Sequence, residues 1–361
     1  MSEGSSAGGL LDGLRVIDLS LWQPGHVATQ LLADLGAEVL KIEPPGGDRM
    51  RPQVGQFISF NGGKRSVVLN LKEEHDQRRF FGYVAEAEVV VENFRPGVAD
   101  RLGVGFEALR AAQPSIVMCS ITGFGQTGPL SQVAGHDHNY QAYAGAFTFP
   151  DGQDPMPAGL LVGDQASGLA AAFAIVAAVL CARRTGGGEH IDVSIADLVA
   201  AWVAPYGPLD PSYPPTPSKE RLPGIGTFRT ADGSFVELGV YSEDHLWDEL
   251  CNALGLSQHA GLTMDQRTEK ASTLRADLAA VIGSRERDEL VQFLSARTVP
   301  IAPILTRAEM LEHPNFRERG VLTIGPDGLR RVGHPIRYTV HKALPPTTPP
   351  ELDEHGDIGF G

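Results

Sequence analysis

The first 204 residues alternate between short apolar runs and segments with helical spacing, and this alternation constrains the fold more than any other feature. Residues 14–19 and 39–42 are apolar and rich in β-branched side chains, which is typical of buried strands. Between them, apolar residues in 27–35 recur at helical spacing, and Gly36 supplies a helix stop. A strand, a helix and a second strand within about thirty residues form a βαβ unit, which implies parallel strands and a right-handed crossover.

The same alternation continues to the end of this region. Further strands are predicted at 67–71, 89–91, 116–121 and 191–194, and helices at 73–86, 166–184 and 195–202. Strands that are apolar throughout and separated by helices are typical of a sheet covered on both faces. We therefore predict an α/β fold in which residues 1–204 form a large, Rossmann-like, doubly wound domain.

The composition changes after this region. Residues 205–224 are rich in proline, which indicates a linker. Residues 225–298 are predicted to form a smaller α+β domain, with a hairpin that turns at Asp232–Gly233 and helices at 244–254, 272–282 and 285–296. Residues 299–361 are predicted to return to the large domain and to end, from Leu344, in an extended, exposed, proline-rich tail.

Composition and charge exclude several classes of protein. The net charge is −14, and a chain this acidic is a poor nucleic-acid binder without a local basic patch. The three cysteines are far apart and lack CxxC spacing, so neither a disulfide framework nor a zinc site is predicted. The N-terminus has no apolar signal segment, and the longest apolar run, 169–182, is shorter than the ~20 residues of a bilayer span. We expect a cytoplasmic protein without metal, nucleic acid or membrane span.

The stretch GHDHNY, residues 135–140, offers a candidate base. His136 lies in a turn-rich setting, and an imidazole ordinarily titrates near neutrality, with Asp137 available to fix its tautomer. The alternative is a turn histidine that bonds only to backbone. A metal site is disfavoured because three or four ligands are required and no further His/Cys cluster is present.

The stretch VGDQASG, residues 162–168, offers a carboxylate, Asp164, at the start of an alanine-rich helix. Ligands bind at the carboxyl ends of strands in open α/β sheets, so Asp164 is placed to act as a base or a nucleophile. The helix dipole favours its ionised form, whereas burial would raise its pKa. The alternative is that Asp164 only caps the helix.

Two further features bear on the ligand. GFGQTG, residues 123–128, matches a dinucleotide fingerprint in letters, but Pro129 follows where a helix should continue, so a substrate-covering loop is favoured. Arg95 precedes a Pro-Gly turn after a buried strand, a position from which a guanidinium can bind phosphate. For this arginine, as for Arg101 and the pair Lys64–Arg65, the alternative is a solvated surface residue.

Six sequence blocks, in the order in which they occur along the chain, resemble the family III CoA-transferases (CaiB/BaiF). The resemblance is closest to the α-methylacyl-CoA racemases of that family. The blocks are residues 13–43, GKRSVVLNLK (63–72), VENFRPG (91–97), TGFGQTGP (122–129), LVGD (161–164) and VPIAPIL (299–305). The resemblance implies a large Rossmann-like domain, a smaller α+β domain and an interlocked homodimer. The active site would lie between the large domain of one subunit and the small domain of the other.

The resemblance also implies roles for the candidate catalytic residues. Asp164 corresponds to the carboxylate that forms an acyl anhydride in the transferases and acts as one of two bases in the racemases. His136 corresponds to the second base of the racemases. The glutamate that supports this histidine corresponds to Glu243, with Glu237 as a rival.

The remaining site residues follow from the same resemblance. Arg95 and Arg101 correspond to positions that contact the CoA phosphates, and Lys64 and Arg65 lie in a comparable basic block. Asp137 and Tyr140 belong to the block that carries the histidine and are assigned to the substrate site.

These assignments predict an α-methylacyl-CoA racemase-like enzyme of fatty acid and lipid metabolism. It would invert the α-carbon of 2-methylacyl-CoA thioesters by proton transfer through an enolate, with His136 and Asp164 on opposite faces and no cofactor besides the CoA thioester. One alternative is CoA transfer between carboxylic acids through an acyl anhydride on Asp164. A second alternative is a non-catalytic acyl-CoA-binding protein.

Overall fold

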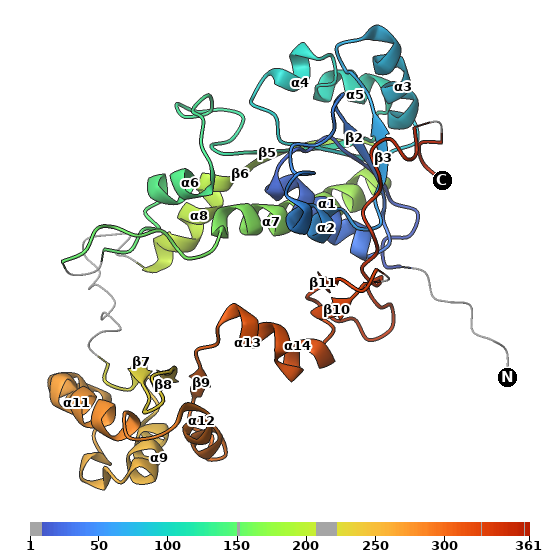
Figure 1. Ribbon diagram of the computed structural model, residues 1–361. Coiled ribbons are helices and arrows are strands. Elements are labelled where there is room, and N and C mark those ends of the chain that lie inside the picture. Colours follow the sequence, from blue (N-terminus) through green and yellow to red (C-terminus); the bar gives the residue numbers. More distant parts are fainter. Residues whose placement is uncertain (1–8, 150–151, 207–221, 326, 357) are drawn as a thin grey trace. The chain divides into compact units, whose positions relative to one another are not determined.

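The computed structural model describes residues 9–149, 152–206, 222–325, 327–356 and 358–361 (Figure 1). The chain divides into two compact units. The large unit is Met1–Tyr206 with Pro314–Gly361, and the small unit is Gly207–His313. Most of the predicted linker at 205–224 lies outside the described residues.

The large unit contains a parallel sheet with the strand order β3-β2-β1-β4-β5-β6. Its strands are β1 Arg15–Asp18, β2 Glu38–Glu43, β3 Arg65–Val68, β4 Val89–Glu92, β5 Val117–Thr122 and β6 Glu189–Ser194. This order is that of the doubly wound fold, and it confirms the predicted fold class. The order reverses between β1 and β4, because the chain leaves β1 in one direction along the sheet and later returns to pair with its other side.

Helices cover both faces of the sheet (Figure 1). Successive strand residues point into two different cores. Val16 packs in the core beneath α1 Gln23–Asp34, α7 Val162–Thr185 and α8 Ile195–Val203. Its neighbour Ile17 packs in the opposite core, beneath α3 Glu74–Val84 and α5 Phe106–Ala112. Because both faces are covered, apolar residues of a central strand such as β4, Val89–Glu92, are buried at consecutive positions rather than at alternate ones.

Within the described part of the chain, α7 alone is long and apolar enough to cross a bilayer by length and composition. It contacts α1, α8, β5 and β6, so these features are those of a core helix. Four shorter helices that precede α7 were not predicted: α2 Val54–Asn61, α4 Val98–Arg101, α5 and α6 Asp137–Tyr143.

The small unit contains an antiparallel sheet of β7 Ile225–Arg229, β8 Phe235–Gly239 and β9 Ile301–Pro303. Its helices are α9 Asp244–Leu254, η3 Ser257–His259, α10 Met264–Glu269, α11 Ala271–Ile282, α12 Arg287–Ser295 and α13 Arg307–Glu312. The hairpin and three of these helices lie where they were predicted. The prediction that the chain returns to the large unit at 299 is wrong, because β9 pairs with β8 and the return begins at Pro314.

The C-terminal segment also differs from the prediction. After α14 Pro314–Glu318 and the hairpin β10 Leu322–Ile324 and β11 Arg330–Val332, the chain runs beside β3 (Figure 1). The backbone N–H of His355 donates to the carbonyl of Ser66, and Phe360 is only 7% exposed. The end of the tail therefore packs on the sheet instead of extending into solvent.

Candidate active site

A cleft of about 730 Å³ lies at the carboxyl ends of the strands, at the switch point between β1 and β4. In open α/β sheets, this crevice is where ligands bind. The lining comes from the segments that follow β1, β2, β4 and β5 and from α6, α7 and α8: Trp22, Gln23, Pro24, Arg49, Met50, Gln53, Asn93, Phe94, Arg95, Pro96, Ile121, Thr122, Gly123, Ser131, Val133, Ala134, Gly135, His136, Asp137, Asn139, Tyr140, Leu161, Asp164 and Ile195.

Asp164 is half-buried in the first turn of α7 and faces this cleft. Burial raises the pKa of its carboxyl from the ordinary 3.8 to about 7, and the negative charge of Asp137 contributes in the same direction. The helix dipole acts against both effects, because the N-terminus of a helix favours a carboxylate. The result is a carboxyl group that changes charge near neutral pH.

Asp137, the first residue of α6, is buried beside Asp164. Its Oδ1 accepts the backbone N–H of Asp164 at 2.8 Å, and its Oδ2 accepts the side-chain amide of Gln141. Gly163 permits this approach, because a Cβ there would lie 2.7 Å from Cγ2 of Ile195 and 2.9 Å from Oδ1 of Asp137. The first turns of α6, α7 and α8 therefore pack closely around the carboxylate of Asp137.

His136 lies immediately before α6 and is exposed in the cleft. Its ring stands edge-on to Trp22, with 6.1 Å between ring centroids, and its backbone N–H donates to the side chain of Asn139 at 2.9 Å. The structure thus brings the predicted imidazole and the predicted carboxylate of Asp164 to the same cleft.

Tyr140 is a buried part of the cleft wall. Its ring packs edge-on against Phe124 at 5.2 Å, and its hydroxyl donates to the carbonyl of Gly135. Burial raises the pKa of this phenol to about 12, and the nearby carboxylates add to the shift. The hydroxyl is therefore occupied within the wall, and Tyr140 shapes the site mainly through its ring.

The predicted phosphate-binding residues fall into two groups. Arg95 lines the cleft with an exposed side chain. Arg101, on the short helix α4, is exposed but does not line the cleft. Their assignment to CoA phosphates remains a prediction for both residues.

Lys64 and Arg65 are not brought to the cleft. The ammonium of Lys64 is buried and donates to Asp18 at 3.0 Å, Thr29 at 2.7 Å and Asn61 at 3.0 Å. Arg65 donates its Nε to the carbonyl of Gly359 in the C-terminal segment. All three protons of the Lys64 ammonium therefore have acceptors. The assignment of Lys64 and Arg65 to CoA binding remains a prediction.

Glu243 and Glu237 belong to the small unit. Glu243 precedes α9 and accepts the backbone N–H of Tyr241 at 3.1 Å, whereas Glu237 on β8 accepts the hydroxyl of Thr227 at 2.9 Å. Both are exposed in the structure. The prediction that one of them supports His136 remains a prediction.

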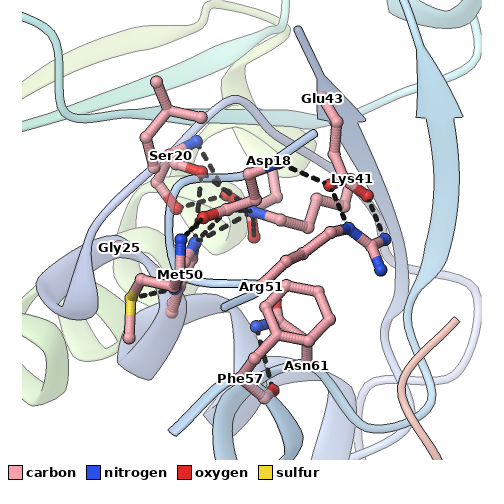
Figure 2. A network of polar contacts seen from close by, with 12 residues as sticks. Asp18, Ser20, Gly25, Lys41, Glu43, Met50, Arg51, Phe57 and Asn61 are labelled. Carbon is pink, nitrogen blue, oxygen red and sulfur yellow. Dashed lines mark hydrogen bonds and ion pairs between the residues drawn. The ribbon is translucent and has the colours of Figure 1, made fainter. Parts of the chain in front are cut away.

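A buried polar network lies beneath the cleft and was not predicted (Figure 2). The ammonium of Lys41 donates to the carbonyl of Ser20 at 2.8 Å and lies 2.6 Å from the carboxylate of Asp48 and 2.9 Å from Nε2 of His26. Burial and Lys41 lower the pKa of His26 to about 4, which keeps this imidazole neutral. Its Nδ1 lies 3.1 Å from the sulfur of Met50, a residue of the cleft wall.

The charges of this network balance. Burial alone would raise the pKa of Asp18, but Lys41 and Lys64 hold it well below its ordinary range. Burial also opposes ionisation of Asp48, yet His26 and Lys41 lower its pKa to about 2. Two carboxylates therefore face two ammonium groups, as a buried set of charges requires.

Sequence reasoning missed the cleft residues that follow β1 and β2, namely Trp22, Gln23, Arg49 and Met50. Their position in the sequence was the signal that could have identified them as cleft residues. They come directly after the first two predicted strands, and the carboxyl ends of parallel strands meet at one edge of the sheet. Arg49 is also one of the two Arg or Lys side chains among the described lining residues.

The chain is similar to known proteins over nearly its whole length. A family model described as CoA-transferase family III matches residues 11–356. An acetyl-CoA:oxalate CoA-transferase of Acetobacter aceti is 35% identical over 96% of this chain and 94% of that protein. A succinate–glutarate CoA-transferase of Agrobacterium fabrum is 35% identical over 86% and 84%. The crystal structure of a CaiB/BaiF family protein from Brucella suis has a TM-score of 0.86 at 32% identity and covers 97% of this chain and 98% of that one.

Proposed function

The chain belongs to CoA-transferase family III, and we propose on that basis that it transfers CoA between carboxylic acids with Asp164 as the nucleophile. The observation that carries the proposal is the half-buried carboxyl group of Asp164, held at a helix N-terminus in a cleft at the switch point. The names of the two relatives describe CoA transfer to or from oxalate, succinate or glutarate, which favours transfer over racemisation.

The proposed reaction proceeds by acyl exchange on Asp164. The carboxylate attacks the thioester carbonyl, the C–S bond breaks, and a mixed anhydride and CoA thiolate result. The thiolate then attacks the aspartyl carbonyl, which releases the donor acid and leaves an aspartyl-CoA thioester. The acceptor carboxylate attacks this thioester, the C–S bond breaks, and a second mixed anhydride and CoA thiolate result. The thiolate then attacks the acceptor carbonyl of the anhydride, which releases the acceptor acyl-CoA and regenerates the Asp164 carboxylate without water or redox change.

The surroundings of Asp164 suit such a nucleophile. Partial burial limits hydrolysis of an activated carboxyl group by water. The hydrogen bond from its backbone N–H to Asp137 fixes the first turn of α7. The N–H groups of Val162, Asp164 and Gln165 already donate within the protein, so this helix end offers few donors to a developing oxyanion.

A second, apolar pocket is lined in part by Phe94, the residue before Arg95. It occupies about 140 Å³ at the ends of β1, β2 and β3, and its lining includes Leu71, Lys72 and Phe94. Phe94 lines both this pocket and the main cleft. This arrangement fits an adenine ring in the apolar pocket, phosphates at Arg95 and the thioester at Asp164.

Trapping of the acyl-enzyme tests the proposal. We expect an acyl-CoA donor to give a hydroxylamine-sensitive adduct on Asp164 that mass spectrometry locates, and Asp164→Ala to lose both the adduct and at least about 1,000-fold in kcat. Asp197 is a matched control because it also lies in the first turn of a helix, α8, but is exposed and outside the cleft. Transfer that survives in Asp164→Ala would exclude this nucleophile.

Racemisation is the second candidate, and the observation that favours it is His136 in the same cleft as Asp164. Two bases on one α-carbon would exchange its proton with solvent. Incubation of 2-methylacyl-CoA esters in D₂O therefore distinguishes the candidates: α-deuteration that depends on His136 supports racemisation, and transfer without deuteration supports the transferase. Binding of CoA esters without either reaction would favour the non-catalytic acyl-CoA-binding protein.

The family resemblance supports four further parts of the proposal. We infer that the substrate is an acyl-CoA and that no other cofactor takes part. We also infer that the enzyme acts as a homodimer in the cytoplasm.

A further inference from the structure

The turn that follows β4 carries two residues of the cleft wall, Phe94 and Arg95. Phe94 also lines the smaller apolar pocket. At the far end of the turn, the carbonyl of Arg95 accepts the N–H of Val98 at 3.0 Å, where α4 begins. The places that the two side chains take in the cleft therefore depend on how the near end of this turn is held.

The near end of the turn is held by the side chains of Glu92 and Asn93. Oε2 of Glu92, the last residue of β4, accepts the backbone N–H of Phe94 at 2.6 Å. Oδ1 of Asn93 accepts the backbone N–H of Leu21 at 3.0 Å. The bond to Glu92 is the one that involves an ionisable group, and it acts on the amide of Phe94 itself. An ionised acceptor makes such a bond short and strong.

The carboxyl group of Glu92 is also held from the side of the sheet. Glu92 pairs in register with Ser120 of β5, and the two side chains are hydrogen-bonded. Oγ of Ser120 lies 2.9 Å from Nε2 of His190 in β6. The ring of His190 stacks on Phe106 of α5, with 5.3 Å between ring centroids. A chain of contacts thus runs from α5 across three strands to the amide of Phe94, so Glu92 gives the turn a fixed point of attachment.

Packing of the core does not account for a carboxyl group at this position. Glu92 is 2% exposed, and no lysine or arginine among the described residues forms an ion pair with it. Burial raises the pKa of its carboxyl from the ordinary 4.5 to about 7, and the charges of Asp100 and Asp192 add to the shift. Val90, two residues earlier on the same face of β4, is apolar and fully buried. An apolar side chain at 92 would avoid the cost of burying a carboxyl group, but it would not hold the amide of Phe94.

We propose that Glu92 is a positioning residue for the CoA thioester, because its carboxyl group fixes the turn that presents Phe94 and Arg95 to the cleft. Glu92 is not among the described residues that line the cleft, so it acts through these two neighbours. The inference rests on the proposed binding of CoA in this cleft, and it gives a role to a buried group beneath it.

The test measures the Kd of CoA by calorimetry and the melting temperature of the full-length protein. We expect Glu92→Leu to raise Kd by about 10-fold, the usual loss for a hydrogen bond to a charged group. Its melting temperature should equal or exceed that of the wild type, because a buried carboxyl group is removed. Glu92→Gln should recover most of the affinity, because its amide oxygen can accept the N–H of Phe94. In transfer assays with saturating acyl-CoA, the kcat of Glu92→Leu should change by less than about 3-fold, because Asp164 lies on another element.

Val90→Ala is the matched control. It shortens a buried side chain on the same strand and face but makes no bond to the turn, so it should lower the melting temperature by about 3–6 °C and leave Kd unchanged. Three outcomes would overturn the inference: a wild-type Kd or a loss of stability in Glu92→Leu, no recovery in Glu92→Gln, or equal weakening in Val90→Ala.

The proposed function is tested separately by the same preparations. If the wild-type protein binds CoA but transfers none, the proposed transfer is wrong, and the comparison of Kd values still decides the role of Glu92. If the wild-type protein binds no CoA, both proposals are wrong.

Discussion

The carboxylate of Asp137 accepts the backbone N–H of Asp164, and the pKa of the Asp164 carboxyl is raised to about 7. Burial is the larger cause of the raised pKa of Asp164, and the charge of Asp137 is the second. A nucleophilic carboxylate must be ionised, so activity should rise with pH as Asp164 loses its proton. The buried neighbour therefore sets part of the pH dependence of the reaction.

Replacing Asp137 by Asn should move this pH dependence to lower pH. Asparagine keeps the shape and can still accept the N–H of Asp164, but it removes the negative charge that opposes ionisation. We expect the acidic limb of kcat/KM to shift from about 7 toward lower pH while staying above 3.8, because burial remains. A pH–rate profile of CoA transfer measures the shift, and Asp197→Asn should leave the profile in place. A shift to higher pH would contradict the electrostatic account.

At the residue scale, the sequence indicated two candidate groups, His136 and Asp164, that the structure brings to one cleft, but it did not indicate their surroundings. The opposing effects of helix dipole and burial on Asp164 follow from its position in the sequence, but their sum depends on tertiary packing. Lys64 illustrates the limit. A basic residue that faces a ligand looks the same in sequence as one that neutralises Asp18, which lies 46 residues away.

At the scale of elements, the close packing of the first turns of α6, α7 and α8 depends on the absence of a side chain at Gly163. Gly163 in α7 lies against Ile195 and Asp137, so the starts of α6 and α8 can approach Asp164. The helix α6 itself is only 7 residues long and was not predicted, because its local signal is weak and its position depends on these contacts. The three-residue strand β9 was assigned to the wrong unit for the same reason.

Gly163→Ala should therefore destabilise the protein, although alanine is the better helix former. The added methyl would lie 2.7 Å from Ile195 and 2.9 Å from Asp137, so the helices must separate, at a cost of about 1–3 kcal/mol in the free energy of unfolding. Denaturant unfolding measures this loss, and kcat should fall with it because Asp164 moves.

Gly82→Ala is the matched control, because Gly82 also lies within a helix, α3, and a Cβ there meets nothing within 4 Å. That change should raise stability by about 0.5–1 kcal/mol. Equal effects of the two substitutions would mean that close packing at Gly163 does not limit the approach of the helices.

At the scale of the whole molecule, the alternation of strands and helices was enough to predict a parallel doubly wound sheet and, with it, the edge where the cleft lies. The C-terminal segment was predicted less well. Its prolines predict extended chain, and residues 342–351 form no helix or strand, but composition does not show where such a chain docks. The partner of Arg65 in this segment lies 294 residues away, at Gly359.

The docked tail should therefore contribute to the stability of the large unit, and Phe360 is where this contribution is concentrated. Its ring is 7% exposed, packs 6.5 Å from Tyr83 between ring centroids, and lies beneath the guanidinium of Arg15 at 5.4 Å. We expect Phe360→Ala to lower the free energy of unfolding by about 2–4 kcal/mol, since it removes a buried ring at the edge of the core. Ile358→Ala is the control, because that side chain is 65% exposed and its loss should cost less than about 0.5 kcal/mol. Equal losses in thermal unfolding, or none at Phe360, would mean that the sheet edge is stable without the tail.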